Sequence, residues 1–168
     1  MLDRQYMINK RLELSKEDVL AYSNDVIEKI KNLSFYNDDL TIGLYMPIRN
    51  ELNIVLNNKN ICYPKVIGDY LKFFFPDSFD YGPFNVLEPN GTEVEKDQID
   101  MIIVPLLYFD KNNNRVGYGK GYYDRYLKDY KGITVGVAYD FQELDNIDAK
   151  PTDVKLNYII KGEKRWKQ

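Results

Sequence analysis

The amino-acid sequence predicts an α/β fold, and two features of its hydrophobic pattern lead to this class. Short, nearly continuous apolar runs such as TIGLYMP (41–47) and IDMIIVPLLYFD (99–110) are typical of strands that are buried on both faces. Between such runs, apolar side chains recur three and four positions apart, as they do on one face of a helix. Because buried strands alternate with amphipathic helices, we expect one sheet covered by helices on both faces.

The composition is that of an ordinary globular protein. With 168 residues, 44% of them hydrophobic and 29% charged, and with no internal repeat or linker, the chain is expected to form one domain over 1–168. The net charge of −3 argues against a nucleic-acid partner, and no apolar run reaches the roughly 18 residues of a membrane helix. The charged N-terminal segment is unlike a signal peptide, and the lone Cys62 fits a reducing cytoplasm.

The sequence contains no histidine, and this absence restricts the chemistry. It excludes Ser-His-Asp and Cys-His nucleophile systems and imidazole acid–base catalysis. With a single cysteine, nitrogen–sulfur zinc sites are excluded as well. A metal would therefore need oxygen ligands, which favours a hard cation such as magnesium. Acid–base work would fall to carboxylates, lysine or tyrosine.

Two helices are expected in the N-terminal part, a shorter one over 3–13 and a longer one that follows it. SKED (15–18) has the pattern of a capping box, which opens a helix. The apolar residues beyond it keep helical spacing to about residue 33; they are Val19, Tyr22, Val26, Ile30 and Leu33.

The remaining segments are assigned from β-branched and aromatic runs and from turn residues. A strand over 41–47 ends at a proline, and the strand over 99–110 has a break at Pro105. The stretch 80–94 contains three turn signals and is expected to be a loop. The other expected elements are a helical turn or two over 51–58 and strands over 60–66, 70–76, 132–140 and 153–161.

The segment NNNRVGYGKGYYDRYL (112–127) has the most unusual composition of the chain. Its three glycines alternate with other residues between a polar turn and a helix that is expected to begin near Gly121. Unpaired N–H groups at a helix start bind anions, and glycines let a phosphate approach the backbone. Arg115 and Lys120 would add positive charge to such a site.

Spacing alone leaves other interpretations of this segment open. Glycines also occur in ordinary turns, and Lys120 is equally explained as a solvated side chain. The helix dipole favours Asp124 in a first turn without any ligand. Tyr123, Tyr126 and Tyr130 are explained by core packing.

The longer string IIVPLLYFDKNNNRVGYGKGYYDRYL resembles the signature of 5-formyltetrahydrofolate cyclo-ligases, also called methenyltetrahydrofolate synthetases. The pattern is met by Pro105, Phe109, Asp110, Arg115, Gly117, Gly119, Gly121, Tyr122, Tyr123, Asp124 and Leu127. The resemblance spans nearly the whole chain, because IGLYMPIRNELN, ICYPKV, LKFFF, YGPFNVLEP, VGVAYDFQ and PTDVKLNYII are similar to further family segments. Thr152 and Leu106 depart from the family's usual His and Gly, and the usual Lys before Arg4 is absent.

The resemblance implies a fold and a reaction. The fold would be a single-domain, three-layer sandwich with a mostly parallel sheet, similar to sugar-phosphate isomerases and CoA transferases. The reaction would be the ATP- and Mg²⁺-dependent closure of 5-formyltetrahydrofolate, possibly polyglutamylated, to 5,10-methenyltetrahydrofolate, in a cytoplasmic monomer. A non-enzymatic nucleotide- or folate-binding module and a sugar-phosphate isomerase are the alternatives.

The family's site residues, carried over to matching positions, divide into four groups. ATP would be bound by Arg4, Arg115, Gly117, Tyr118, Gly119, Lys120, Gly121, Tyr122 and Tyr123. The folate would contact Met46, Glu51, Tyr118, Gly119, Lys120, Gly121 and Tyr122. Asp124 and Asp153 would hold magnesium, and the catalytic set would be Arg115, Lys120, Tyr122 and Asp124. Without the resemblance, a structural role is favoured for both carboxylates, Glu51 at a helix start and Asp153 in the turn that enters a strand.

Overall fold

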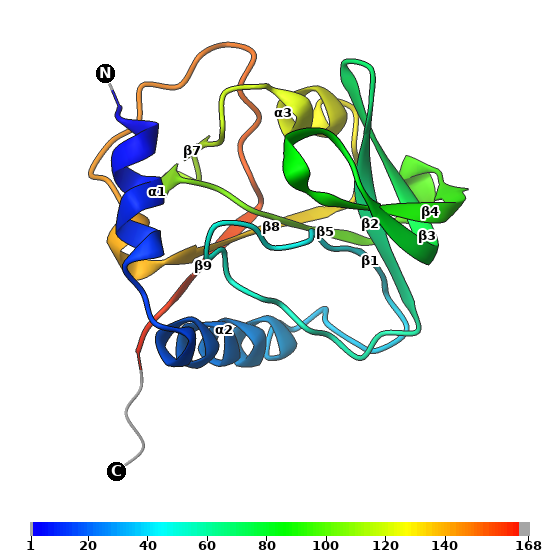
Figure 1. Cartoon of the computed structure of the whole chain (residues 1–168), viewed down its shortest axis with the longest axis horizontal. Helices are drawn as coiled ribbons and strands as arrows, with labels where there is room; N and C mark the ends of the chain where they lie inside the picture. The colour runs from blue at the N-terminus through cyan, green and yellow to red at the C-terminus, as the bar shows by residue number, and fades with distance from the viewer. Residues whose placement is uncertain (1, 165–168) are drawn as a thin grey trace.

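A seven-stranded mixed sheet forms the centre of the molecule, in the order β4-β3-β2-β1-β5-β8-β9 (Figure 1). The computed structural model describes residues 2–164, so residues 1 and 165–168 of the expected domain lie outside the described residues. The strands are β1 (Thr41–Gly43), β2 (Asn60–Ile67), β3 (Tyr70–Tyr81), β4 (Leu87–Val94), β5 (Met101–Val104), β8 (Ile133–Tyr139) and β9 (Tyr158–Gly162). The neighbouring strands β2, β1, β5, β8 and β9 pair in parallel. Strand β3 pairs in the antiparallel sense with both β2 and β4. The predicted α/β class with a mostly parallel sheet is confirmed.

Helices cover both faces of this sheet. Helix α2 (Lys16–Lys31) lies along one face, and the short α3 (Tyr122–Leu127) lies on the other side (Figure 1). Helix α1 (Arg4–Leu12) packs beside the small antiparallel pair β6 (Tyr108–Phe109) and β7 (Arg115–Val116). The part of the chain that the structure describes also contains three 3₁₀ turns: η1 (Pro83–Asn85), η2 (Lys96–Gln98) and η3 (Asp140–Gln142). No helix within residues 2–164 has the length and apolar character needed to cross a membrane.

The capping box predicted from SKED is present at the start of α2. The Ser15 hydroxyl accepts from the Asp18 backbone N–H at 3.0 Å, and the Asp18 carboxylate accepts from the Ser15 N–H at 3.4 Å. These two bonds satisfy donors that the first turn leaves unpaired. The helix that follows therefore begins where the sequence predicts.

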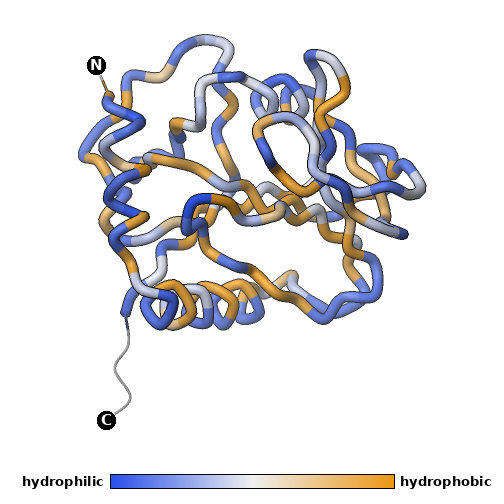
Figure 2. Tube along the Cα trace, viewed as in Figure 1, coloured by the Kyte–Doolittle hydropathy of each residue, from blue (hydrophilic) through white to orange (hydrophobic). Residues whose placement is uncertain are grey.

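The hydrophobic core is divided by the sheet into two main clusters. Along β5, Met101 and Ile103 pack on the side of α2, while Ile102 and Val104 pack on the side of α3. All four are fully buried, which explains why this strand is apolar at every position rather than at alternate ones. The central strands are accordingly orange along much of their length in Figure 2.

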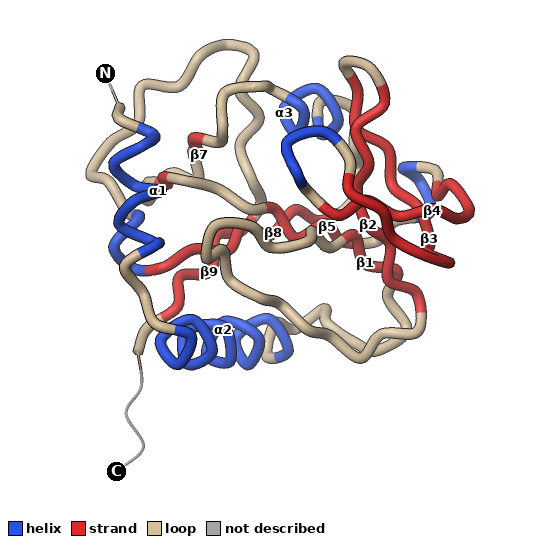
Figure 3. The backbone as a smooth tube through the Cα atoms, viewed as in Figure 1, coloured by secondary structure: helices blue, strands red, loops and turns tan. Residues whose placement is uncertain are grey.

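The expected helical turn over 51–58 was wrong. The segment runs extended without helix, and it is drawn as loop between β1 and β2 in Figure 3. Leu52, Ile54 and Leu56 are buried, whereas the residues between them are exposed. This two-residue period is that of an extended chain on a protein surface and not that of a helix.

The expected loop over 80–94 was also wrong, because β3 continues to Tyr81 and pairs with β4 along most of this stretch. Pro89 and Gly91 lie within β4, which is an edge strand of the sheet and so tolerates a residue without an N–H donor. Only residues 82–86 form the connection, where Phe84 and Asn85 adopt positive φ values of 63° and 58°.

Three further strands are shorter than expected. The strand predicted over 41–47 ends at Gly43, and the one predicted over 153–161 begins only at Tyr158. The strand predicted over 99–110 is interrupted at Pro105, as expected, and its two parts join different sheets. These shortened ends leave coil segments along one side of the sheet, and the candidate site is built from several of them.

Candidate active site

A polar turn over 110–114 fixes the segment that leads into the glycine loop. The Asp110 carboxylate accepts from the backbone N–H groups of Asn112 and Asn114 at 3.0 Å, from Asn114 Nδ2 at 3.1 Å, and from the Ile147 N–H at 2.9 Å. Burial raises the pKa of Asp110, but these hydrogen bonds outweigh burial and hold the pKa below its usual value. The turn thereby places Arg115 opposite Phe109 in the β6–β7 pair.

The glycine loop over 117–121 is surrounded by arginines. Gly119 and Gly121 have φ values of +96° and +72°, which glycine adopts without strain. Arg4 Nε donates to the Gly117 carbonyl at 2.8 Å, and a Cβ on Gly121 would lie 2.8 Å from Arg125 Nη1. A side chain at Gly119 or Gly121 would strain the backbone, and at Gly121 it would also displace the Arg125 guanidinium. The loop therefore keeps bare backbone next to positive charge.

Arg115 is a buried cation at the base of this loop. Its side chain is 7% exposed, and its Nη1 lies 3.3 Å from Asp124 Oδ1. Burial lowers the pKa of Arg115, while Asp124 and, more weakly, Asp153 oppose the shift. The buried Nε has no hydrogen-bond partner among the described residues. An unused guanidinium donor beside bare backbone is suited to a phosphate oxygen.

The two expected metal ligands lie in neighbouring segments. Asp124 Oδ1 also accepts from the Val154 N–H at 3.1 Å, and Asp153 Oδ2 accepts from the Lys150 N–H at 2.8 Å. Within residues 2–164 no group of three or more acidic, histidine or cysteine side chains gathers to form a metal centre. Two carboxylates still fit magnesium, because this ion commonly completes its shell with phosphate oxygens and water.

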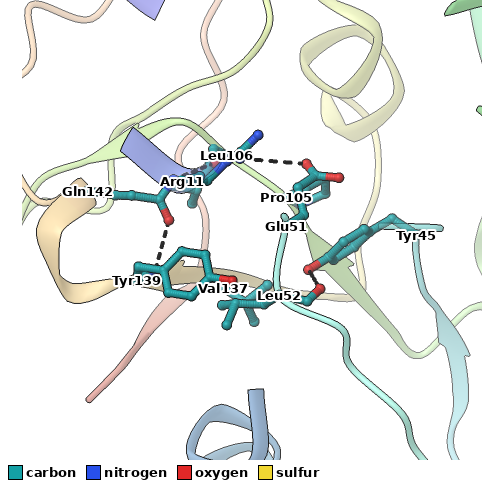
Figure 4. A pocket seen from close by; sticks show the side chains of 9 residues that line it. All are labelled: Arg11, Tyr45, Glu51, Leu52, Pro105, Leu106, Val137, Tyr139 and Gln142. Carbon is teal, nitrogen blue, oxygen red and sulfur yellow. Dashed lines mark hydrogen bonds and ion pairs between the residues drawn. The ribbon is translucent and has the colours of Figure 1, made fainter. Parts of the chain in front are cut away.

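A second cluster, which contains Glu51, lies beside a small pocket between α1, β8 and the 44–52 segment (Figure 4). Glu51 and Arg11 point toward one another there, and Glu51 Oε2 lies 3.0 Å from the Tyr118 hydroxyl. Tyr45 donates to the Leu52 carbonyl at 2.5 Å, and Tyr139 donates to the Asn50 carbonyl at 2.8 Å. These two tyrosines hold the Glu51 segment in place.

An exposed aromatic side chain faces the same loop from the β3–β4 connection. Phe84 is 53% exposed, and its ring centroid lies 6.5 Å from that of Tyr122. Lys120 Nζ lies 5.6 Å from the centroid of the Phe84 ring. A positive φ is uncommon for a bulky residue such as Phe84.

The structure brings most of the predicted site residues together around the loop. Arg4, Arg115, Asp124 and Glu51 each contact the loop or the residues that flank it, while Met46 lies half-buried in the segment that carries Glu51. Three further residues lie against the loop or its flanking residues and were not among the predicted site residues: Arg11, Phe84 and Arg125. For Arg11 a signal was available, because it shares the inward face of α1 with Met7 and Ile8.

The fold and the site define an α/β protein with a basic, glycine-rich loop suited to anions. The model of the 5-formyltetrahydrofolate cyclo-ligase family matches residues 2–162. The chain belongs to the 5-formyltetrahydrofolate cyclo-ligase family, and it is a ligase.

Individual relatives agree with this family. The chain is 35% identical to a 5-formyltetrahydrofolate cyclo-ligase of Mycoplasma pneumoniae, covering 95% of this chain and 96% of the relative. A Mycoplasma genitalium protein of the same name is 31% identical, with 94% of both chains covered. The solved structure of a 5,10-methenyltetrahydrofolate synthetase from Aquifex aeolicus has a TM-score of 0.82 at 34% identity, covering 94% of this chain and 87% of that one. The corresponding Mycoplasma pneumoniae structure has a TM-score of 0.78 at 33% identity, covering 95% and 96%.

Proposed function

We propose that this chain closes the ring of 5-formyltetrahydrofolate, using ATP and Mg²⁺, to give 5,10-methenyltetrahydrofolate, ADP and phosphate. Family membership supports the overall conversion. The single observation that best supports the use of ATP is the buried Arg115 guanidinium, whose Nε has no partner beside the glycine loop. Arg4 adds a second guanidinium at the same loop. Both would bind the phosphates of ATP.

The folate would lie on the other side of the loop, against Glu51. The Glu51 carboxylate is buried and next to Tyr118, so it is suited to accept N–H groups of a pterin ring. Met46 lies in the same segment, and the exposed ring of Phe84 offers a flat apolar surface near Tyr122. The two ligands would meet at residues 118–122.

The proposed chemistry activates a poor leaving group. The formyl group on N5 is amide-like, so its oxygen does not leave unaided. Transfer of the γ-phosphoryl group to that oxygen releases ADP and creates a phosphate ester. N10 then attacks the formyl carbon, loses its proton, and phosphate departs as the five-membered ring closes. This sequence needs positioned charge rather than an imidazole base, which agrees with a chain that has no histidine.

The chain's own residues would divide this work. Arg115 and Lys120 would bind and orient the transferred phosphoryl group, and Tyr122 would pack against the reacting ligands. Asp124 and Asp153 would hold magnesium, with phosphate oxygens and water completing the shell. When bound, magnesium would offset the negative charge of the phosphates.

The reaction is tested by following the near-ultraviolet absorbance of the methenyl product. We expect product only when 5-formyltetrahydrofolate, ATP and Mg²⁺ are all present, with one ADP formed for each ring closed. Arg115→Ala protein, purified in the same way, controls for contaminating activity and is expected to be inactive. Product formed without nucleotide would contradict the proposal, as would binding of both ligands without turnover, which is the behaviour of a binding module. Isomerisation of a sugar phosphate without ATP would support the other alternative. Cytoplasmic location, a monomeric state and use of polyglutamylated folates stay predictions of the sequence.

A further inference from the structure

Arg11 carries a charge in the interior of the protein, where an unpaired cation is costly. It is 1% exposed and lies on the inward face of α1, and its Nε has no hydrogen-bond partner among the described residues. The Asn50 side chain donates to the Arg11 carbonyl at 3.0 Å and to the Leu14 carbonyl at 3.1 Å. The end of α1 is thereby attached to the segment that carries Glu51. Packing alone does not explain why the charged Arg11 side chain is buried beside Glu51, the proposed folate-binding carboxylate.

The hydrogen-bond directions around Arg11 are fixed by chemistry. A guanidinium can only donate, so the Tyr118 hydroxyl accepts from Arg11 Nη2 at 2.6 Å. The single proton of that hydroxyl then points to Glu51 Oε2, 3.0 Å away. Glu51 Oε1 accepts from the Ile48 N–H at 2.9 Å. Both carboxylate oxygens already accept hydrogen bonds, which favours the ionised form of Glu51.

We propose that Arg11 is a positioning residue for folate recognition, which acts through the Tyr118 hydroxyl to hold Glu51 as an oriented carboxylate. The proposal rests on the proposed function for the identity of the ligand. Arg11 Nη1 lies 4.0 Å from Glu51 Oε2, so its charge also acts on Glu51 directly. A carboxylate accepts N–H groups of the ligand, whereas a protonated Glu51 would present a donor to them. Arg11 thus selects ligands that offer donors at this place.

The other groups around Glu51 make Arg11 important for its ionisation. Burial raises the pKa of Glu51, and Arg11 is the strongest of the groups that oppose this rise. The titratable and charged groups that interact with Glu51 are Arg11 of α1, Arg49 of the same segment, Tyr45 after β1, Tyr118 of the glycine loop, Tyr123 of α3 and Tyr139 of β8. Burial raises the pKa of each of these four tyrosines. The two arginines are therefore the positive charges that oppose the rise in the pKa of Glu51.

The first test measures ligand affinity as a function of pH by calorimetry. Arg11→Gln is expected to weaken binding of 5-formyltetrahydrofolate about tenfold or more at neutral pH, and the loss should grow as pH falls, because Glu51 takes up a proton. ATP affinity should stay within about twofold, since the side-chain contacts of Arg11 are to Tyr118 and Glu51 and not to Arg115. Arg11→Lys keeps a charge and should lose less. Tyr118→Phe keeps the ring and the loop backbone but removes the bridging hydroxyl, so it should weaken the folate more than ATP. Lys10→Gln and Tyr6→Phe, which change side chains of α1 outside the network, are the matched controls.

The second test needs no ligand and no activity. Infrared difference spectra identify the Glu51 carboxyl by the band that Glu51→Gln removes. We expect a carboxylate band in the wild-type protein and a protonated carboxyl band in Arg11→Gln at the same neutral pH. Equal protonation midpoints for Glu51 in the two proteins, or in Arg11→Lys if the glutamine variant does not fold, would overturn the proposal. If the wild-type protein binds no folate, the proposed function fails, while the infrared result still decides what Arg11 does to Glu51.

Discussion

Asp124 has two protein partners and one proposed ligand, and a single substitution separates these roles. Its Oδ1 accepts from Arg115 and from the Val154 N–H. An asparagine at this position offers a carbonyl oxygen to the same two donors but carries no charge. The structural interactions therefore survive in Asp124→Asn, while a magnesium ligand is lost.

For Asp124→Asn we expect a folded protein with a near-normal melting temperature. The kcat for ring closure should fall at least about a hundredfold, because this is the usual effect of losing an electrostatic group that acts in the transition state. Higher Mg²⁺ should restore part of the rate. If Asp124 only complements the start of α3, stability falls by about 0.3–1 kcal/mol and kcat is nearly unchanged. Asp129→Asn, beyond the other end of this helix and 77% exposed in its side chain, is the control.

A site residue could be predicted from the sequence pattern when it lies in the same short segment as other site residues. Arg115, the glycines and Asp124 stand within one short segment, so their pattern was readable directly. Arg4 and Glu51 are separated from that segment by many residues, and only the resemblance to a family pointed to them. Arg11 was missed because an arginine in an amphipathic helix is normally exposed, although it shares the apolar face of α1 with Met7 and Ile8.

Among the elements, the turn over 110–114 shows how a few polar residues position a functional side chain. The turn was predicted from its composition, but the way in which Asp110 ties it to the distant Ile147 N–H was not. The two misassigned elements have equally physical causes. Alternation over 51–58 was short enough to be read with either period, and the turn residues of 80–94 are tolerated in an edge strand.

Asp110→Asn tests the turn. An amide cannot accept at both of its ends, so the donors Asn114 Nδ2 and Ile147 N–H lose their acceptor, at a cost of about 1–3 kcal/mol for each group left unsatisfied. Because the pKa of Asp110 is lower in the folded protein, its stabilising effect is present above the unfolded pKa and is lost as pH falls through the folded pKa. Urea unfolding should therefore show a large difference between wild type and variant at neutral pH that shrinks below about pH 4. The exposed Asp148→Asn should show no such difference, and a pH-independent gap would contradict the prediction.

For the molecule as a whole, the class of fold was predictable and the order of the strands was not. Apolar strands alternating with helices indicate α/β, but the pairing of β1 with both β2 and β5 depends on contacts between distant segments. The contact between helix α2 and strand β9 likewise joins segments that are distant in the sequence. Helix α2 packs on β9, and a Cβ on Gly162 would lie 2.9 Å from Val26 Cγ2.

Gly162→Ala should therefore overpack this contact and lower the free energy of unfolding by about 1–3 kcal/mol. Val26→Ala alone should also destabilise, because it leaves a cavity next to β9. Together the two changes should cost less than their sum, since the smaller side chain makes room for the added methyl group. A thermodynamic cycle from denaturant unfolding measures this, and strict additivity would show that the two residues do not constrain each other.

The contact between α2 and β9 also has a consequence for protein synthesis. Helix α2 leaves the ribosome more than a hundred residues before its partner strand does. Until residues 158–162 have emerged, the side of the helix that carries Val26 lacks part of its cover. Nascent chains that stop short of β9 would present this apolar stripe to chaperones and proteases. A chain that has lost residues 158–162 is therefore expected to expose apolar side chains of α2 that β9 otherwise covers.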